Sequence, residues 1–88
     1  MEDLRLNQLK QLILTSKKIV GLRQVNKNLL ENTIKCVIVS IDSDDFIYNA
    51  VKEKATLQNI PVYRKFKSQE IGKFCKIDVS CSVVGILS

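Results

Sequence analysis

The side chains best suited to recognise another molecule lie in the segment 19–27, which reads IVGLRQVNK. A short β-prone pair ends at Gly21, and a helix is expected to begin directly after it. Free backbone N–H groups at such a helix start attract phosphate. Arg23 can offer a guanidinium fork to a guanine edge, and Gln24 carries a donor and an acceptor for a base edge. Lys27, one turn further on, can meet a phosphate or a base, so the pattern fits nucleic-acid binding.

The net charge suits the same kind of partner. Fourteen Lys and Arg residues oppose nine Asp and Glu residues, which gives a formal charge of +5. A basic excess favours a polyanion such as nucleic acid. Both observations also have a simpler explanation, because many small domains are mildly basic for solubility and polar helix faces are routine. The residue types alone leave both interpretations open.

Length and composition exclude several classes of protein. The 88 residues are 45% hydrophobic and 26% charged, which predicts one ordered domain spanning residues 1–88. A domain of this size buries a little over ~60% of its unfolded surface, enough for a core but not for a large internal active site. No apolar run approaches the roughly 18 residues of a membrane-spanning helix, and the polar N-terminus excludes a signal peptide. We therefore expect a cytoplasmic protein with no membrane partner.

The inventory of reactive side chains argues against an enzyme. Histidine, the commonest general base and metal ligand, is absent. The three cysteines, Cys36, Cys75 and Cys81, contain no CxxC pair and are expected to be buried thiols, with a Cys75–Cys81 disulfide as the alternative. The acidic run 42–45 could hold Mg²⁺, but acids at a helix start are more often caps. No nucleophile–base pair is evident, so we expect no catalysis, no metal and no cofactor.

The apolar spacing predicts an alternation of helices and strands. The helix after the acidic run should bury Ile47, Ala50, Val51 and Leu57, and Pro61 should follow its end. Ser68 is expected to cap a short last helix with Gly72 near its end. Helices are predicted at 4–14, 22–31, 45–58 and 68–71, and strands at 19–20, 36–41, 62–66 and 79–87. This order implies an α/β sandwich in which helices cover a central sheet.

Four collinear segments also resemble one family. GLRQVNK is similar to the start of the RNA-contacting helix in the kink-turn-binding ribosomal protein superfamily, whose archaeal members carry Gly-x-Asn-Glu-x-x-Lys. The short bacterial YbxF-like members have a basic residue and Gln there, as this chain does. CVIVSIDSDD, NIPVYRKF and EIGKFCKIDVSCSVVGIL resemble the central strand, the Asn-Val-Pro strand entry and the final segment of the family. The resemblance covers residues 18–87, to within a residue or two.

The resemblance implies a three-layer α-β-α sandwich around a mixed four-stranded sheet, and binding to a kink-turn, a bent RNA built around tandem sheared G·A pairs. The start of the second helix would meet those pairs. The loop before the last strand would pack on the bent strand, and Asp44 would lie near the extruded nucleotide. Core packing of Ile77 and Val79 and helix capping by Asp44 are the alternatives. The candidate RNA-binding residues are Gly21, Leu22, Arg23, Gln24, Lys27, Asp44, Ile77, Asp78, Val79 and Ser80.

The chain departs from the family pattern at three positions. Leu22 stands where Thr is frequent, Ile41 where Glu is frequent, and Lys76 where the loop has Gly. The first two remove polar contacts, and Lys76 can alter the loop because Gly tolerates backbone angles that other residues avoid. The expected function is recognition and stabilisation of a kink-turn in a structured RNA, such as ribosomal or riboswitch-like RNA, by a monomer that can associate with the ribosome. The alternative is a protein-interaction module of the same fold with weakened or lost RNA binding.

Overall fold

Helices and strands alternate along the whole described part of the chain, as the sequence predicts. The structure is a computed structural model that describes residues 6–87, so residues 4 and 5 of the first predicted helix lie outside it. None of the described helices is long and apolar enough to cross a membrane. The elements are α1 Leu6–Thr15, β1 Lys18–Val20, α2 Leu22–Leu30, β2 Ile34–Val39, α3 Asp45–Leu57, β3 Val62–Arg64, α4 Ser68–Phe74 and β4 Val83–Leu87.

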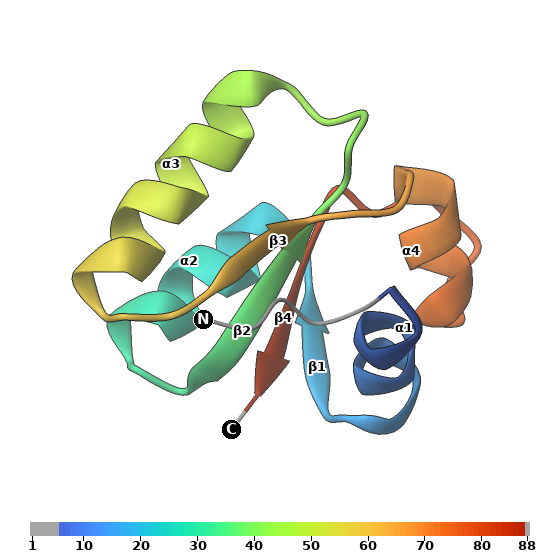
Figure 1. The fold of residues 1–88 in the computed structure, drawn as a ribbon, viewed down its shortest axis with the longest axis horizontal. Coiled ribbons are helices and arrows are strands. Elements are labelled where there is room, and N and C mark those ends of the chain that lie inside the picture. Colours follow the sequence, from blue (N-terminus) through green and yellow to red (C-terminus); the bar gives the residue numbers. More distant parts are fainter. Residues whose placement is uncertain (1–5, 88) are drawn as a thin grey trace.

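The four strands form one mixed sheet in the order β1-β4-β2-β3. Strands β2 and β3 are parallel, while β4 is antiparallel to both β1 and β2. Helices α2 and α3 cover one face of the sheet, and α1 and α4 cover the other (Figure 1). The predicted three-layer α-β-α sandwich with a central mixed four-stranded sheet is therefore confirmed.

The sheet separates two apolar clusters, because successive strand side chains point to opposite faces. On β2, Val37 and Val39 pack under α2 and α3, whereas Cys36 and Ile38 pack under α1 and α4. Ile34 lies on the same side as Val37 because the pairing of β2 with β4 shifts register between Ile34 and Cys36. Strand β2 therefore begins two residues earlier than the predicted 36–41, and it also ends two residues earlier, so Ser40 and Ile41 lie in the following loop.

All three cysteines are free thiols, and no described pair forms a disulfide. Cys36 and Cys81 are buried, and Cys75 is half-buried. The prediction of buried thiols thus holds for two residues and in part for the third.

The carboxyl-side ends of three strands and the start of β4 meet at one edge of the sheet. Val20 pairs with Val84, Val39 with Val83, and Val39 also with Arg64. The loops that lead into α2, α3, α4 and β4 all emerge there. Segments that are far apart in the sequence are thereby brought to one edge of the molecule.

The predicted buried face of α3 is wrong at two positions. Val51 and Ala55 are buried and Ile47 is half-buried, a spacing of four residues that keeps them on one side of the helix. Ala50 is exposed, and Leu57 is 82% exposed at the last residue of the helix. Ala55, which was not predicted to be buried, is fully buried, whereas Leu57, which was, is exposed.

The last helix and strand also differ from their predicted bounds. Helix α4 continues to Phe74 and has Lys67 at its N-cap, so Ser68 is its first residue rather than its cap. The Lys67 N–H donates to Glu70 Oε1 at 2.9 Å. Gly72 lies buried inside the helix instead of at its end, and β4 begins at Val83 instead of Val79. Residues 79–82 form a loop that packs on α4.

Candidate nucleic-acid interface

Helix α2 begins at the shared edge with an uncapped N-terminus. Gly21, at the N-cap, has φ 98°, a left-handed conformation that favours glycine, and no side chain caps the helix. The Gly21 N–H donates to the Val83 carbonyl at 2.9 Å, which fixes the helix start to β4. The next helical N–H groups have no carbonyl four residues earlier in the helix, so they are donors for an external acceptor. The positive end of the helix dipole lies at the same point.

Helix α2 turns an apolar side to the sheet and a polar side to the solvent. Val25 and Leu29 are fully buried, while Arg23, Gln24 and Lys27 are exposed. These three side chains make no hydrogen bond or ion pair with any residue of the part of the chain that the structure describes. The first turn carries no acidic residue. Their donors and the Gln24 acceptor are therefore accessible to a bound polyanion.

A shallow hollow joins the start of α2 to the loop before β4. Its volume is about 320 Å³. Val79 is 68% exposed there, which rules out the core alternative for Val79. Ile77 is half-buried and packs against the apolar cluster under α1 and α4, so the core alternative holds in part for Ile77. The hollow is lined by Val20, Gly21, Leu22, Ile47, Ile77, Val79, Ser80, Cys81, Ser82 and Val83. Five candidate residues from segments more than fifty positions apart thus share one surface.

Helix α4 holds this loop by close backbone contact. A Cβ on Gly72 would collide with the carbonyl oxygen of Val79, so the loop can lie here only because residue 72 is glycine. The Gly72 carbonyl accepts the Ile77 N–H at 3.0 Å. Lys76 adopts φ 60°, the left-handed conformation that the Gly of the family would take easily. The substitution at 76 therefore keeps the glycine-like turn and adds a positive charge.

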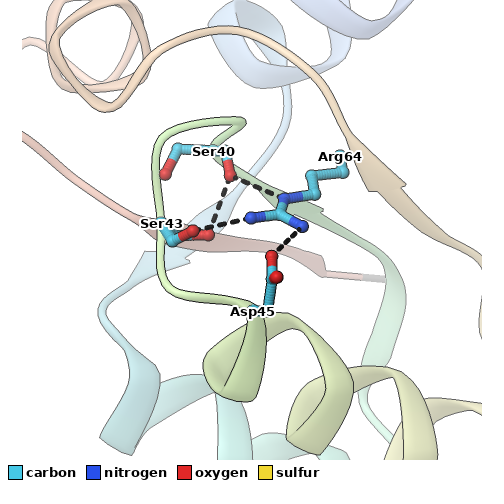
Figure 2. A network of polar contacts seen from close by, with 4 residues as sticks. All are labelled: Ser40, Ser43, Asp45 and Arg64. Atoms are coloured by element: carbon cyan, nitrogen blue, oxygen red, sulfur yellow. Dashed lines mark hydrogen bonds and ion pairs between the residues drawn. The ribbon is translucent and has the colours of Figure 1, made fainter.

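The acidic run at 42–45 has its carboxylates in different roles. Asp42 accepts from the Ser68 N–H and hydroxyl, both at 3.0 Å. The nearby Ser40 hydroxyl and these bonds hold the pKa of Asp42 below its ordinary value. Asp45 pairs with Arg64 at 2.9 Å (Figure 2).

Asp44 occupies the N-cap position of α3, where its carbonyl accepts the Ile47 N–H at 3.1 Å. Its carboxylate makes no capping bond, so the capping alternative holds for the backbone of Asp44 and not for its side chain. Over residues 6–87 no three His, Cys, Asp or Glu side chains come together as metal ligands.

The hollow does not include every candidate, and it includes residues that the sequence analysis missed. Asp78 is exposed but does not line it, and Arg23, Gln24, Lys27 and Asp44 lie outside it. The lining residues that were not candidates are Val20, Ile47, Cys81, Ser82 and Val83. The sequence carried no signal that these residues would line a surface hollow. Ile47, for example, has the spacing of a core residue. A larger hollow of about 470 Å³, lined by α1 and Lys35, contains none of the candidates.

Curated proteins and solved structures resemble this chain over most of its length. An RNA-binding protein of Geobacillus sp. strain WCH70 is 37% identical over 71 residues, which cover 81% of this chain and 87% of the relative. RNA-binding protein YbxF of Geobacillus stearothermophilus is 35% identical over the same shares. A structure titled as a protein with unknown function from Bacillus halodurans C has a TM-score of 0.83 at 20% identity, over 90% of this chain and 83% of that one. The Giardia lamblia 15.5kD RNA binding protein has a TM-score of 0.77 at 17% identity, over 98% and 78%.

The layered fold and the exposed edge define the class: a small α-β-α protein that presents an uncapped helix start to its surroundings. The family model described as ribosomal protein L7Ae/L30e/S12e/Gadd45 matches residues 5–88. The chain belongs to this family, which confirms the resemblance stated from the sequence, including that to the short bacterial YbxF-like members. The family is non-catalytic, so the protein is not an enzyme.

Proposed function

We propose that the protein binds structured RNA at a kink-turn, through the edge that carries the start of α2 and the loop before β4. The observation that carries this proposal is the hollow that Gly21 and Leu22 share with Ile77, Val79 and Ser80. Beside it stand an uncapped helix start and exposed basic and amide side chains. Relatives at 37% and 35% identity are named as RNA-binding proteins, which supports the same partner.

The geometry suits a bent RNA better than a straight one. A regular A-form helix has a deep, narrow major groove that side chains cannot read. Arg23 and Gln24 project from a helix end, so they require a groove opened by distortion, such as the one at sheared G·A pairs. The exposed apolar side chain of Val79 then packs on the strand that folds back across the bend. Since these contacts exist only with the kinked form, binding shifts the RNA population toward it.

Two departures from the family pattern adjust this interface without removing it. Leu22 is half-buried and lines the hollow, so it contributes apolar contact where a hydroxyl is frequent. Lys76 adds a charge beside the loop. We assign the whole chain 1–88 to a single RNA-binding domain that acts as a monomer in the cytoplasm. A ribosomal RNA or a riboswitch-like RNA is the partner we expect.

A direct binding comparison tests the proposal. The protein is titrated against an RNA that contains a kink-turn and against a straight duplex of equal length, by electrophoretic shift and by fluorescence transfer between the RNA ends. We expect tighter binding to the kinked RNA and a protein-dependent approach of its ends. Equal affinity for the two RNAs contradicts the proposal. Absence of any RNA affinity, with partners that survive nuclease treatment in a pull-down, favours the protein-interaction alternative.

A further inference from the structure

We propose that Arg64 is a positioning residue for RNA recognition: it fixes the loop 40–45, which presents Asp44, and does not itself contact the RNA. This inference rests on the proposed function, since it concerns how that interface is kept in shape. Arg64 is the last residue of β3 and lies at the shared edge of the sheet. A basic residue in this place would ordinarily be counted among the phosphate ligands.

The guanidinium of Arg64 is directed into the protein. Its Nε donates to the Ser40 carbonyl at 3.3 Å, and its Nη2 donates to the Ser43 carbonyl at 2.6 Å. Its Nη1 pairs with Asp45 Oδ1 at 2.9 Å, and Figure 2 shows all three partners arranged around the guanidinium. The Arg64 side chain is only 26% exposed, compared with 84% for Asp45. All three guanidinium nitrogens thus have partners within the protein.

The face of the guanidinium is held as well as its edge. Its central carbon lies 5.1 Å from the centre of the Tyr48 ring, within the range of a cation–π contact. The partners come from the loop that follows β2 (Ser40 and Ser43) and from the first turn of α3 (Asp45 and Tyr48). A guanidinium that is bonded through all three nitrogens and placed over an aromatic ring is restricted in its orientation. Arg64 therefore ties β3 to the whole connection between β2 and α3.

The clamped segment is the one that carries Asp44. Ser43 and Asp45, its two neighbours, are both bonded to Arg64, and the Ser43 hydroxyl donates to the Ser40 carbonyl at 2.8 Å. The Asp44 carboxylate makes no capping bond. Loops lose backbone entropy when a ligand orders them, and a loop that is ordered beforehand avoids that cost on binding. In the proposed binding mode only the kinked RNA brings a nucleotide to this loop, so losing the clamp should weaken the binding of kinked RNA more than that of straight RNA.

The variant Arg64→Lys separates positioning from direct phosphate contact. Lysine keeps the positive charge, but it lacks the planar fork and cannot bond both carbonyls and the carboxylate together. We expect the ratio of kinked to straight affinity to fall about tenfold, as for the loss of one or two hydrogen bonds to a charged group. We expect the salt dependence of binding to stay unchanged. Amide hydrogen exchange at residues 41–45 of the free protein should become faster.

Two further variants complete the test. Asp45→Asn removes the one carboxylate partner of Arg64 and leaves both carbonyl contacts, so its ratio of kinked to straight affinity should lie between those of wild type and Arg64→Lys. If Arg64→Lys does not fold, Asp45→Asn serves as the test variant in its place. Lys54→Arg, a basic exchange in the last turn of α3, is the matched control. A wild-type protein without preference for kinked RNA overturns the proposed function. A wild-type preference that Arg64→Lys leaves intact, or an equal loss for both RNAs, overturns the positioning role alone.

Discussion

At the residue scale, the candidate interface carries polar side chains that make no hydrogen bond or ion pair with the described residues of the protein. Arg23, Gln24 and Lys27 make no side-chain bond within residues 6–87, whereas Arg64 has partners for its whole guanidinium. Charge alone does not separate these two situations, because all are polar residues near one edge of the sheet. Their hydrogen-bond partners do separate them. The distinction predicts which substitutions change RNA binding directly.

Lys27→Ala should weaken binding to kinked and straight RNA by a similar factor. A lysine that meets a phosphate contributes a charge-dependent and sequence-independent interaction, and its loss should lower the salt slope by about 1. The measurement is the affinity for both RNAs over a series of salt concentrations. Lys54→Ala, an exposed lysine in the last turn of α3, is the matched control and should leave the affinity and the slope near wild type. An unchanged slope in Lys27→Ala contradicts a phosphate contact.

The variant Gln24→Ala, in contrast to Lys27→Ala, should affect the binding of kinked and straight RNA unequally. An amide that reads a base edge discriminates by roughly 1–3 kcal/mol, so kinked RNA should lose that much and straight RNA little. Replacing the G·A pairs by Watson–Crick pairs should then cost the variant less than it costs wild type. Gln11→Ala on α1, also exposed, is the control. Equal losses on both RNAs would assign Gln24 to the backbone rather than to a base.

At the scale of elements, local sequence patterns predicted which helices and strands form, but not always the residues at which they begin and end. The eight elements and the amphipathic face of α2 follow from apolar spacing and from Gly21 and Pro61. The entry to β4 does not, because residues 79–82 are β-prone locally and are held as a loop by their contact with α4. The sequence pattern places Gly72 at a helix end. In the structure its role is to let the backbone of Val79, seven residues later, come close to the helix. Such contacts between elements leave no local signal.

The variant Gly72→Ala tests the contact between α4 and the Val79 carbonyl, and the expected change in stability is opposite to the usual one for this substitution in a helix. Inside a helix the change from Gly to Ala stabilises by roughly 0.5–1 kcal/mol when space allows. Here the added Cβ would collide with the Val79 carbonyl, so we expect a net destabilisation of about 1–3 kcal/mol from overpacking. Kinked RNA should also bind more weakly, because the loop bearing Val79 and Ser80 must move. Urea unfolding and RNA titration measure the two effects. A more stable variant with unchanged affinity would show that the loop is not held by this contact.

At the scale of the whole molecule, the sheet is the common support of the interface and of both apolar clusters. Strand β2 lies inside the sheet, between β4 and β3, and its residues pack against the helices on both faces. Cys36 of β2 is 3% exposed, and burial raises the pKa of its thiol from 9.0 to about 11, with Lys35 opposing the shift. The thiol is thus a titratable group in the apolar core.

The stability of the fold should fall in alkaline solution in a way that depends on Cys36. Because the pKa is raised in the folded state, its contribution is complete below pH 9 and is lost as the pH rises through about 11. Two pKa units correspond to a loss on the order of 2–3 kcal/mol. The measurement is urea unfolding under reducing conditions at several pH values between 8 and 11. The variant Cys36→Val keeps an apolar, β-prone side chain and removes the thiol, while every other ionisable group is common to the two proteins. The difference in stability between the two proteins should therefore shift in favour of the variant above pH 9, and a constant difference across this range would mean that the thiol ionises in the fold as easily as in the unfolded chain.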